Sequence, residues 1–362
     1  MSGRALFLIL LLSGSAAFAQ SSGKAASSPS PSSGVAANPS VRSLVDSMDA
    51  ADLQEAIQIL KSNFIKQESL NDTELNRATL EGLLERLDRG VIVSTDARSA
   101  APPDNPFFGE ILEGHIGYLR PGAFVRPNLE ALDAHLQTYA GKKIDAVVID
   151  LRASSATDDF AIAADFTKRF CPKGKPLFTL RKTTARQERS FTSDRDPAYQ
   201  GLIILLADGD TAGAPEAVAG VLRHYNKALL IGQPTAGRAV EYNDMRLPSG
   251  KSLRVAVGEA ILPEGRPLFP DGLKPDVPVE MLAADKREVF QLSREKGMTQ
   301  FVVEAERPHL NEAALMSGRN PDIEVMEAAQ RRAKSADKPA VRDPVLQRAL
   351  DLVTSISIFQ KR

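Results

Sequence analysis

The chain has a single cysteine, Cys171, so it forms no internal disulfide. Within Phe-Cys-Pro, this residue is expected to be a small buried apolar side chain, and a reactive thiol is the alternative. The four histidines are scattered, and no two of them have the spacing of metal ligands. We therefore expect no metal ion and no cofactor.

Excess charge is also absent, because the formal net charge is -1. Such a balance gives no electrostatic support for binding nucleic acid or an anionic membrane. Beyond the N-terminus no apolar run is long enough to span a bilayer, which takes about 20 residues. No internal repeat of fixed period is visible. The composition, 43% hydrophobic, is that of ordinary globular material.

The first 19 residues have the pattern of a secretory signal peptide. Arg4 precedes an apolar run from Ala5 to Leu12, and small residues predict cleavage after Ala19. A retained membrane anchor is the alternative, although the run is short for a span. Residues 20–40 are rich in Ser, Ala, Pro and Gly, so we expect a disordered leader there. Export to the periplasm or the medium follows from this interpretation.

Residues 41–96 are expected to form an N-terminal helical subdomain. Apolar residues recur at helical spacing over 41–66 and again over 71–87. Asn71, with Glu74 three residues later, is the expected N-terminal cap of the second helix.

Residues 107–282 are expected to form an α/β core domain. Strand patterns cover 115–120, 144–152, 176–181, 202–206 and 228–231, and helical patterns cover 129–139, 160–170 and 214–224. This alternation predicts βαβ connections and a sheet with parallel pairs. A hairpin over 245–257, turning at Pro248-Ser-Gly250, and a further strand over 259–262 follow.

Residues 283–362 are expected to be a C-terminal helical extension, with helical patches at 287–296, 323–334 and 345–358.

Six short motifs follow one another in a characteristic order. They are Leu80-Glu-Gly-Leu-Leu-Glu-Arg-Leu-Asp88, Gly117-Tyr-Leu-Arg120, Val148-Ile-Asp-Leu-Arg152, Asp210-Thr-Ala-Gly-Ala-Pro-Glu216, Ile231-Gly-Gln-Pro-Thr-Ala-Gly-Arg238 and Gly272-Leu-Lys-Pro-Asp276. In this order they resemble the C-terminal processing (tail-specific) serine peptidases, peptidase family S41. The resemblance implies the core of that family, a mixed sheet with helices of the crotonase/ClpP type. The PDZ module that the family often carries has no room between residues 89 and 113.

The resemblance implies a Ser-Lys dyad, but the matching positions hold other residues. Aligned through Glu216, the nucleophile position falls on Gly213, the general-base position on Arg238, and the assisting glutamine on Tyr242. Glycine has no nucleophilic atom. An arginine, with a pKa above about 12, does not become neutral to accept a proton.

The oxyanion hole that the resemblance implies is altered as well. Its Gly-Gly pair falls on Ala156 and Thr157, beside Ser155, and the donor on the helix side would be the amide of Ala214. The helix N-terminus with its free amides and Arg238 also suggests a carboxylate pocket.

Nearby hydroxyl groups supply candidate substitutes for the missing nucleophile. They belong to Ser154, Ser155 and Thr211, but no neutral base accompanies them. Thr211 is instead expected to cap the helix that begins near Ala214.

The leading hypothesis is an exported, catalytically degenerate S41 peptidase, a pseudoenzyme that binds or scaffolds polypeptides in the cell envelope. Its partners would be C-terminal tails or a partner envelope protein. One alternative is an active serine-type endopeptidase of family S41 with a shifted nucleophile. Another is a structural partner that acts through residues 283–362.

Overall fold

The chain divides into two units, Met1–Asn76 and Arg77–Arg362. The computed structural model describes residues 40–95, 105–142, 144–182, 184, 186–302 and 341–360. The expected signal peptide, the expected leader up to residue 39 and the expected helix over 323–334 lie outside these residues.

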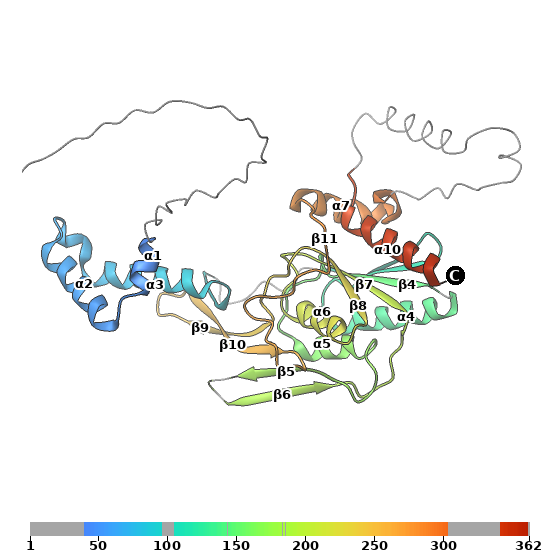
Figure 1. Ribbon diagram of the computed structural model, residues 1–362, viewed down its shortest axis with the longest axis horizontal. Helices are drawn as coiled ribbons and strands as arrows, with labels where there is room; N and C mark the ends of the chain where they lie inside the picture. The colour runs from blue at the N-terminus through green and yellow to red at the C-terminus, as the bar shows by residue number, and fades with distance from the viewer. Residues whose placement is uncertain are drawn as a thin grey trace, which may run out of the picture. The chain divides into compact units, whose positions relative to one another are not determined.

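The first unit is helical in its described residues (Figure 1). It contains α1 (Val41–Asp46), α2 (Ala50–Asn63), the 3-10 turn η1 (Gln67–Leu70) and the start of α3 (Asp72–Leu87), which continues into the second unit. The helix expected over 41–66 is therefore two helices. The reason is Asp49, whose carboxylate accepts hydrogen bonds from the N–H groups of Ala51 and Asp52, both at 2.8 Å, and starts a new helix. The expected cap at Asn71 is confirmed, since its side chain accepts from the N–H of Glu74 at 3.0 Å.

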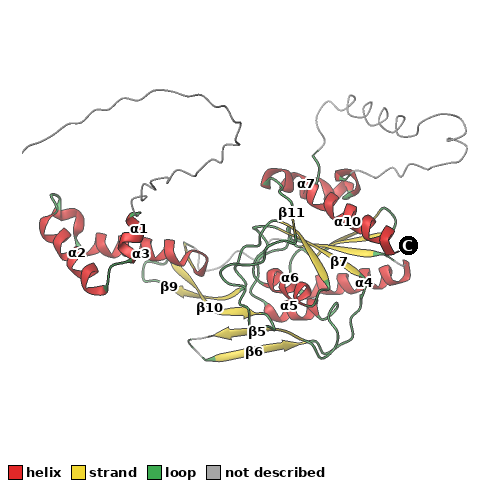
Figure 2. Ribbon diagram, viewed as in Figure 1, coloured by secondary structure: helices red, strands yellow, loops and turns green. Residues whose placement is uncertain are grey.

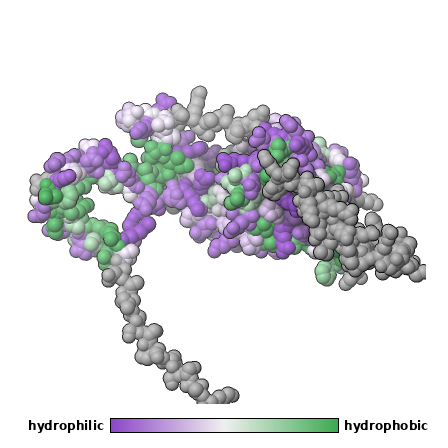
Figure 3. Space-filling view, turned by 90° about the horizontal axis from the view of Figure 1, so that it is seen from above, coloured by the Kyte–Doolittle hydropathy of each residue, from purple (hydrophilic) through white to green (hydrophobic). Residues whose placement is uncertain are grey.

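The helices α1, α2 and α3 bury none of their residues. Large apolar side chains such as Ile57, Leu60 and Leu83 are about half exposed. Hydrophobic surface is visible over this part of the chain in Figure 3. These three helices contribute nothing to the hydrophobic core.

The second unit contains two sheets. The first, antiparallel in its pairings, has β1 (Val91–Ser94), β10 (Ser252–Ile261), β5 (Pro176–Lys182) and β6 (Gln187–Thr192) in that order, with β9 (Val240–Arg246) also paired to β10. The second has the order β11 (Val277–Pro278), β8 (Ala228–Gly232), β7 (Leu202–Ala207), β4 (Ala146–Asp150), β3 (Ile116–Arg120) and β2 (Phe108–Leu112). In the second sheet, β11, β8, β7, β4 and β3 are parallel and β2 is antiparallel. The expected α/β core with parallel strand pairs is confirmed.

Helices cover both faces of the parallel sheet (Figure 2). One face packs on α4 (Arg126–Lys142), α5 (Phe160–Thr167) and α6 (Ala214–His224), and α5 and α6 also pack on β5 of the other sheet. The other face packs on α7 (Ala283–Lys296), the 3-10 turn η3 (Thr299–Phe301) and α10 (Pro344–Gln360). Strands buried on both faces need apolar residues at every position, which explains the continuous apolar runs of β4 and β7.

The β-rich end of the core differs in one respect from the sequence expectation. The expected hairpin is formed by β9 and β10, with Pro248 to Gly250 between them. The strand expected over 259–262 is the end of β10, which continues past an irregularity between Ala256 and Gly258.

A buried ion cluster attaches α10 to the sheet. Arg152, just after β4, donates to Asp150 through Nε at 2.9 Å and to Asp343 at 3.0 and 2.7 Å. Asp343 also accepts from the N–H groups of Val345 and Leu346, so it caps α10. The C-terminal helices are thus part of the second unit's core.

Candidate functional site

The residues that the family resemblance singled out meet at one edge of the parallel sheet. The turn after β4, the turn between β7 and α6, and the turn after β8 all lie at the carboxyl ends of parallel strands, the usual place for a site in such sheets. The first two turns touch through an isolated bridge between Thr157 and Gly213. The expected nucleophile and oxyanion positions are therefore neighbours.

Gly213 stands where only glycine fits. It precedes the first residue of α6 with φ 69° and ψ −131°, a region that side chains with a Cβ atom rarely adopt. A Cβ built on Gly213 would lie 2.2 Å from the carbonyl oxygen of Thr157. A nucleophilic side chain has no space at this position.

The two expected oxyanion donors are not available to a ligand together. The N–H of Ala214 donates to the carbonyl oxygen of Thr157 at 2.7 Å, so a protein oxygen occupies the donor on the helix side. The expectation of free amides at the helix N-terminus is also wrong for residues 214–216. Pro215 has no N–H, and the N–H of Glu216 donates to Gly213 at 3.1 Å.

Glu216 lies at the centre of the site, a role that the sequence analysis missed. Its fully buried carboxylate accepts from the hydroxyl of Thr235 and from the N–H groups of Gly237 at 2.7 Å and Arg238 at 2.8 Å. Burial raises the pKa of Glu216 above its ordinary value of 4.5, although these hydrogen bonds and the charge of Arg238 oppose the shift. Glu216 thereby ties the start of α6 to the turn that carries the general-base position.

Arg238 and Tyr242 lie on the turn and strand that follow β8. The Arg238 guanidinium forms no hydrogen bond or ion pair with any described residue, and its side chain is partly exposed. The Tyr242 hydroxyl donates to the carbonyl oxygen of Arg89 at 2.6 Å. Burial raises the pKa of Tyr242, while the charges of Arg238 and Arg254 oppose this. Tyr242 is therefore a protonated hydrogen-bond donor.

The candidate hydroxyl groups have no base beside them. The Oγ atoms of Ser154 and Ser155 are buried and have no hydrogen-bond partner among the described residues. Thr211 does not cap α6, because its Oγ1 accepts from the N–H of Asp208 and donates to Leu151. The expected cap is wrong, since Thr211 precedes Gly213 and its side chain faces β4 and β7.

A lysine does lie beside this turn, but it is fully charged. Lys286 of α7 is buried, with Nζ 2.5 Å from Asp208 and 2.6 Å from Asp210. Burial alone would lower the pKa of Lys286, but the two carboxylates outweigh it and raise the pKa. Lys286 therefore holds α7 to the β7–α6 turn and does not accept a proton.

Neither Cys171 nor any cluster of potential metal ligands among the described residues forms a second reactive site. Burial raises the pKa of Cys171 to about 12, with Lys227 opposing, so the thiol stays protonated, which argues against a reactive thiol. In the described ranges no cluster of three or more His, Cys, Asp or Glu has the arrangement of a metal site. No helix there combines the length and the apolar composition that a membrane crossing requires.

Comparison with known proteins gives the same family that the motifs resemble. Residues 115–279 match the sequence profile described as "Peptidase family S41". The chain is 26% identical over 175 residues to the carboxyl-terminal-processing peptidase 2, chloroplastic, of Arabidopsis thaliana, which covers 48% of the chain and 34% of that relative. It is 28% identical over 187 residues to the carboxy-terminal-processing protease of Bartonella bacilliformis, covering 50% of the chain and 43% of that relative. The chain thus spans less than half the length of these relatives.

Among solved structures, similar chains include the photosystem II D1 C-terminal processing protease. Its TM-score is 0.41 at 19% identity, covering 52% of this chain and 47% of that one. A putative peptidase from Parabacteroides merdae has a TM-score of 0.47 at 18% identity, covering 67% of this chain and 85% of that one.

Proposed function

We propose that this chain, which belongs to peptidase family S41 over residues 115–279, has Gly213 and Arg238 at the dyad positions of that family and is a polypeptide-binding protein without peptidase activity. The observation that carries the proposal is the closure of the Thr157 carbonyl over Gly213. That oxygen fills the space of a nucleophile and takes the Ala214 donor at the same time. In serine peptidases, loss of the nucleophile alone costs about a millionfold in rate.

The alternative, an active endopeptidase with a shifted nucleophile, has one observation in its favour. Ser154 and Ser155 present buried hydroxyl groups without partners on the turn that faces Gly213. A serine hydroxyl needs a neutral base, however, and Lys286 is held charged between two aspartates. The geometry therefore favours the non-catalytic function.

A fluorophosphonate probe tests the proposal on the natural chain. We expect no covalent labelling and no hydrolysis of casein, with an active serine protease as positive control. The variant Gly213→Ser/Arg238→Lys is expected to stay inactive as well, because the serine Cβ meets the Thr157 carbonyl. Labelling of the natural chain that disappears in Ser154→Ala or Ser155→Ala would establish the active alternative.

Polypeptide is the ligand class that we propose, either a C-terminal tail or a partner envelope protein. The names of the relatives describe carboxyl-terminal processing, which is an action on polypeptides. Capture of peptides from a library with free carboxyl ends tests this ligand class, and a chain that binds none of them contradicts it.

Export is the second part of the proposal. It rests on the basic residue, the short apolar run and the small residues of 1–19. We expect the chain purified from the periplasm or the medium to begin at Gln20, which mass spectrometry of the intact protein measures. A protein recovered from the cytoplasm with residues 1–19 attached would contradict this.

A further inference from the structure

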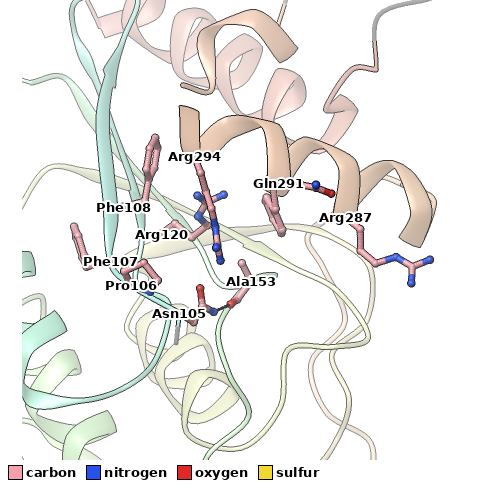
Figure 4. Close-up of a pocket in the computed structure, with 10 residues that line it drawn as sticks. Asn105, Pro106, Phe107, Phe108, Arg120, Ala153, Arg287, Gln291 and Arg294 are labelled. Carbon is pink, nitrogen blue, oxygen red and sulfur yellow. Dashed lines mark hydrogen bonds between the residues drawn. The ribbon is translucent and has the colours of Figure 1, made fainter. Parts of the chain in front are cut away.

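A cavity of about 640 Å³ lies beside the turn after β4, away from Gly213 and Arg238. The start of β2, the end of β3 and one side of α7 form its walls (Figure 4). Its lining residues include Phe107, Phe108, Arg120, Phe290, Gln291 and Arg294. Three arginines and three phenylalanines contribute to this lining, and no acidic residue does.

Among the residues that the structure describes, Arg120 is a buried cation without an anionic partner. The residue is 4% exposed, and no carboxylate pairs with it within the described ranges. Its guanidinium carbon lies 4.7 Å from the ring centre of Phe108 and 5.0 Å from that of Phe290. One N–H group donates to the Ser293 hydroxyl at 3.0 Å. Aromatic faces and one hydroxyl stabilise the charge of Arg120 only partly. An anion that enters the cavity can therefore form an ion pair with this guanidinium.

The cavity side of α7 adds a second cation and an amide. Residues 287, 290, 291 and 294 follow helical spacing and share one face of the helix. Figure 4 shows Arg294 reaching from α7 into the cavity. Neither Arg294 nor Gln291 makes a hydrogen bond or ion pair with a described residue.

From this arrangement we infer that the cavity binds a carboxylate that carries an apolar group. The planar forks of Arg120 and Arg294 match a carboxylate, and the rings of Phe107, Phe108 and Phe290 match an apolar group next to it. The cavity volume lies in the range of small-ligand sites. A bare inorganic anion would leave the aromatic walls unused.

Two sources supply this chemistry, the chain end of a polypeptide with an apolar last residue and a free carboxylic acid. The Gln291 amide favours the chain end, because it offers a donor and an acceptor to the last peptide group. A fatty acid has no such group.

Fluorescence polarisation on the full natural chain tests the inference. The probe is a short fluorescein-labelled peptide ending in leucine with a free carboxylate. The unlabelled competitors are the same peptide, its amidated form and decanoate. We expect Arg294→Ala to weaken binding about tenfold or more, the effect of losing a charge-assisted hydrogen bond. Lys296→Ala is the matched control, because this residue is an exposed cation on the same helix and does not line the cavity. We expect it to change binding less than about twofold.

Each result has a definite meaning. Displacement by the free-acid peptide but not by the amide or by decanoate assigns the site to chain ends, and displacement by decanoate at lower concentration than by the free-acid peptide assigns it to free carboxylic acids. Equal competition by amide and acid, equal effects of Arg294→Ala and Lys296→Ala, or no binding of either ligand would overturn the inference. Because the probe labelling of serine tests catalysis separately, failure here leaves the proposed loss of peptidase activity unaffected.

Discussion

At the residue scale, glycine at position 213 is required by the backbone of this chain. Two separate features exclude a side chain there, the positive φ and the Thr157 carbonyl 2.2 Å from the Cβ position. The same closure satisfies the Ala214 amide. The expected nucleophile position and the expected oxyanion donor are therefore blocked by one backbone contact, and neither can be opened without the other.

Gly213→Ala should lower the free energy of unfolding by about 2–5 kcal/mol, from backbone strain and overpacking together. Gly174→Ala is the matched control, with φ 82° and nothing within 4 Å of the Cβ position. It should cost only about 1–2 kcal/mol, the cost of the positive φ. Urea unfolding followed by circular dichroism measures both. Equal losses would show that the Thr157 turn moves freely away from Gly213.

Glu216 should give the stability of the fold a specific pH dependence. Since burial raises its folded pKa, the folded chain holds this proton more tightly than the unfolded chain. This stabilising contribution is fully present below pH 4.5 and is lost as the pH rises through the raised pKa.

Glutamine does not titrate. The free energy of unfolding of the natural chain minus that of Glu216→Gln should therefore be largest at low pH and fall as the pH rises. Urea unfolding from about pH 4 to about pH 8 measures it. Glu188→Gln, on the exposed strand β6, controls for the change in net charge. A difference that grows with pH would mean that the three hydrogen-bond donors lower the pKa of Glu216.

At the element scale, the sequence predicts the buried elements better than the exposed ones. The apolar runs of β4 and β7 identify them as strands because both of their faces are covered. The polar strand β6 was missed, since Gln187–Thr192 lies mostly exposed at the edge of its sheet and has no apolar pattern. The break between α1 and α2 depends on the Asp49 cap, which the apolar spacing conceals.

The candidate site was predicted in its parts but not in its contacts. Motif order identified Gly213 and Thr157, and the structure places them side by side. The Thr157 carbonyl that fills the site is a backbone group, so its contact cannot be predicted from the type of residue. The role of Glu216 also depends on backbone amides, those of Gly237 and Arg238. A glutamate two residues after a proposed helix start is the one signal that was present.

The attachment of α10 depends on one buried aspartate. Asp343→Asn leaves Arg152 with Asp150 alone, and should lower the free energy of unfolding by about 3–5 kcal/mol, the cost of breaking a buried ion pair. Asp351→Asn is the same change on the exposed side of the same helix, and should cost no more than about 0.5 kcal/mol. Chemical denaturation measures both. Similar losses would indicate that apolar packing alone holds α10.

At the scale of the whole molecule, the two ends of the chain contribute unequally to the core. All buried apolar residues of the two core clusters lie between Leu112 and Val353. One cluster lies between the parallel sheet and the C-terminal helices, and includes Val289, Leu346 and Leu350. Deleting residues 283–362 therefore does not test whether they are a separate binding element, because their removal exposes one face of the sheet.

Two truncated chains test the unequal contributions of the two chain ends to the hydrophobic core. A chain that begins at Asp88 loses α1, α2 and α3, which bury no residue, and should keep a cooperative thermal transition within a few degrees of the natural one. A chain that ends at Leu282 loses the cover of Ile116, Val148 and Ile204, and should show no cooperative transition. Differential scanning calorimetry distinguishes these outcomes. If the first truncation also abolished the transition, the apolar side chains of α1 to α3 would have to be counted with the core, and the function of the chain would have to be sought in both units together.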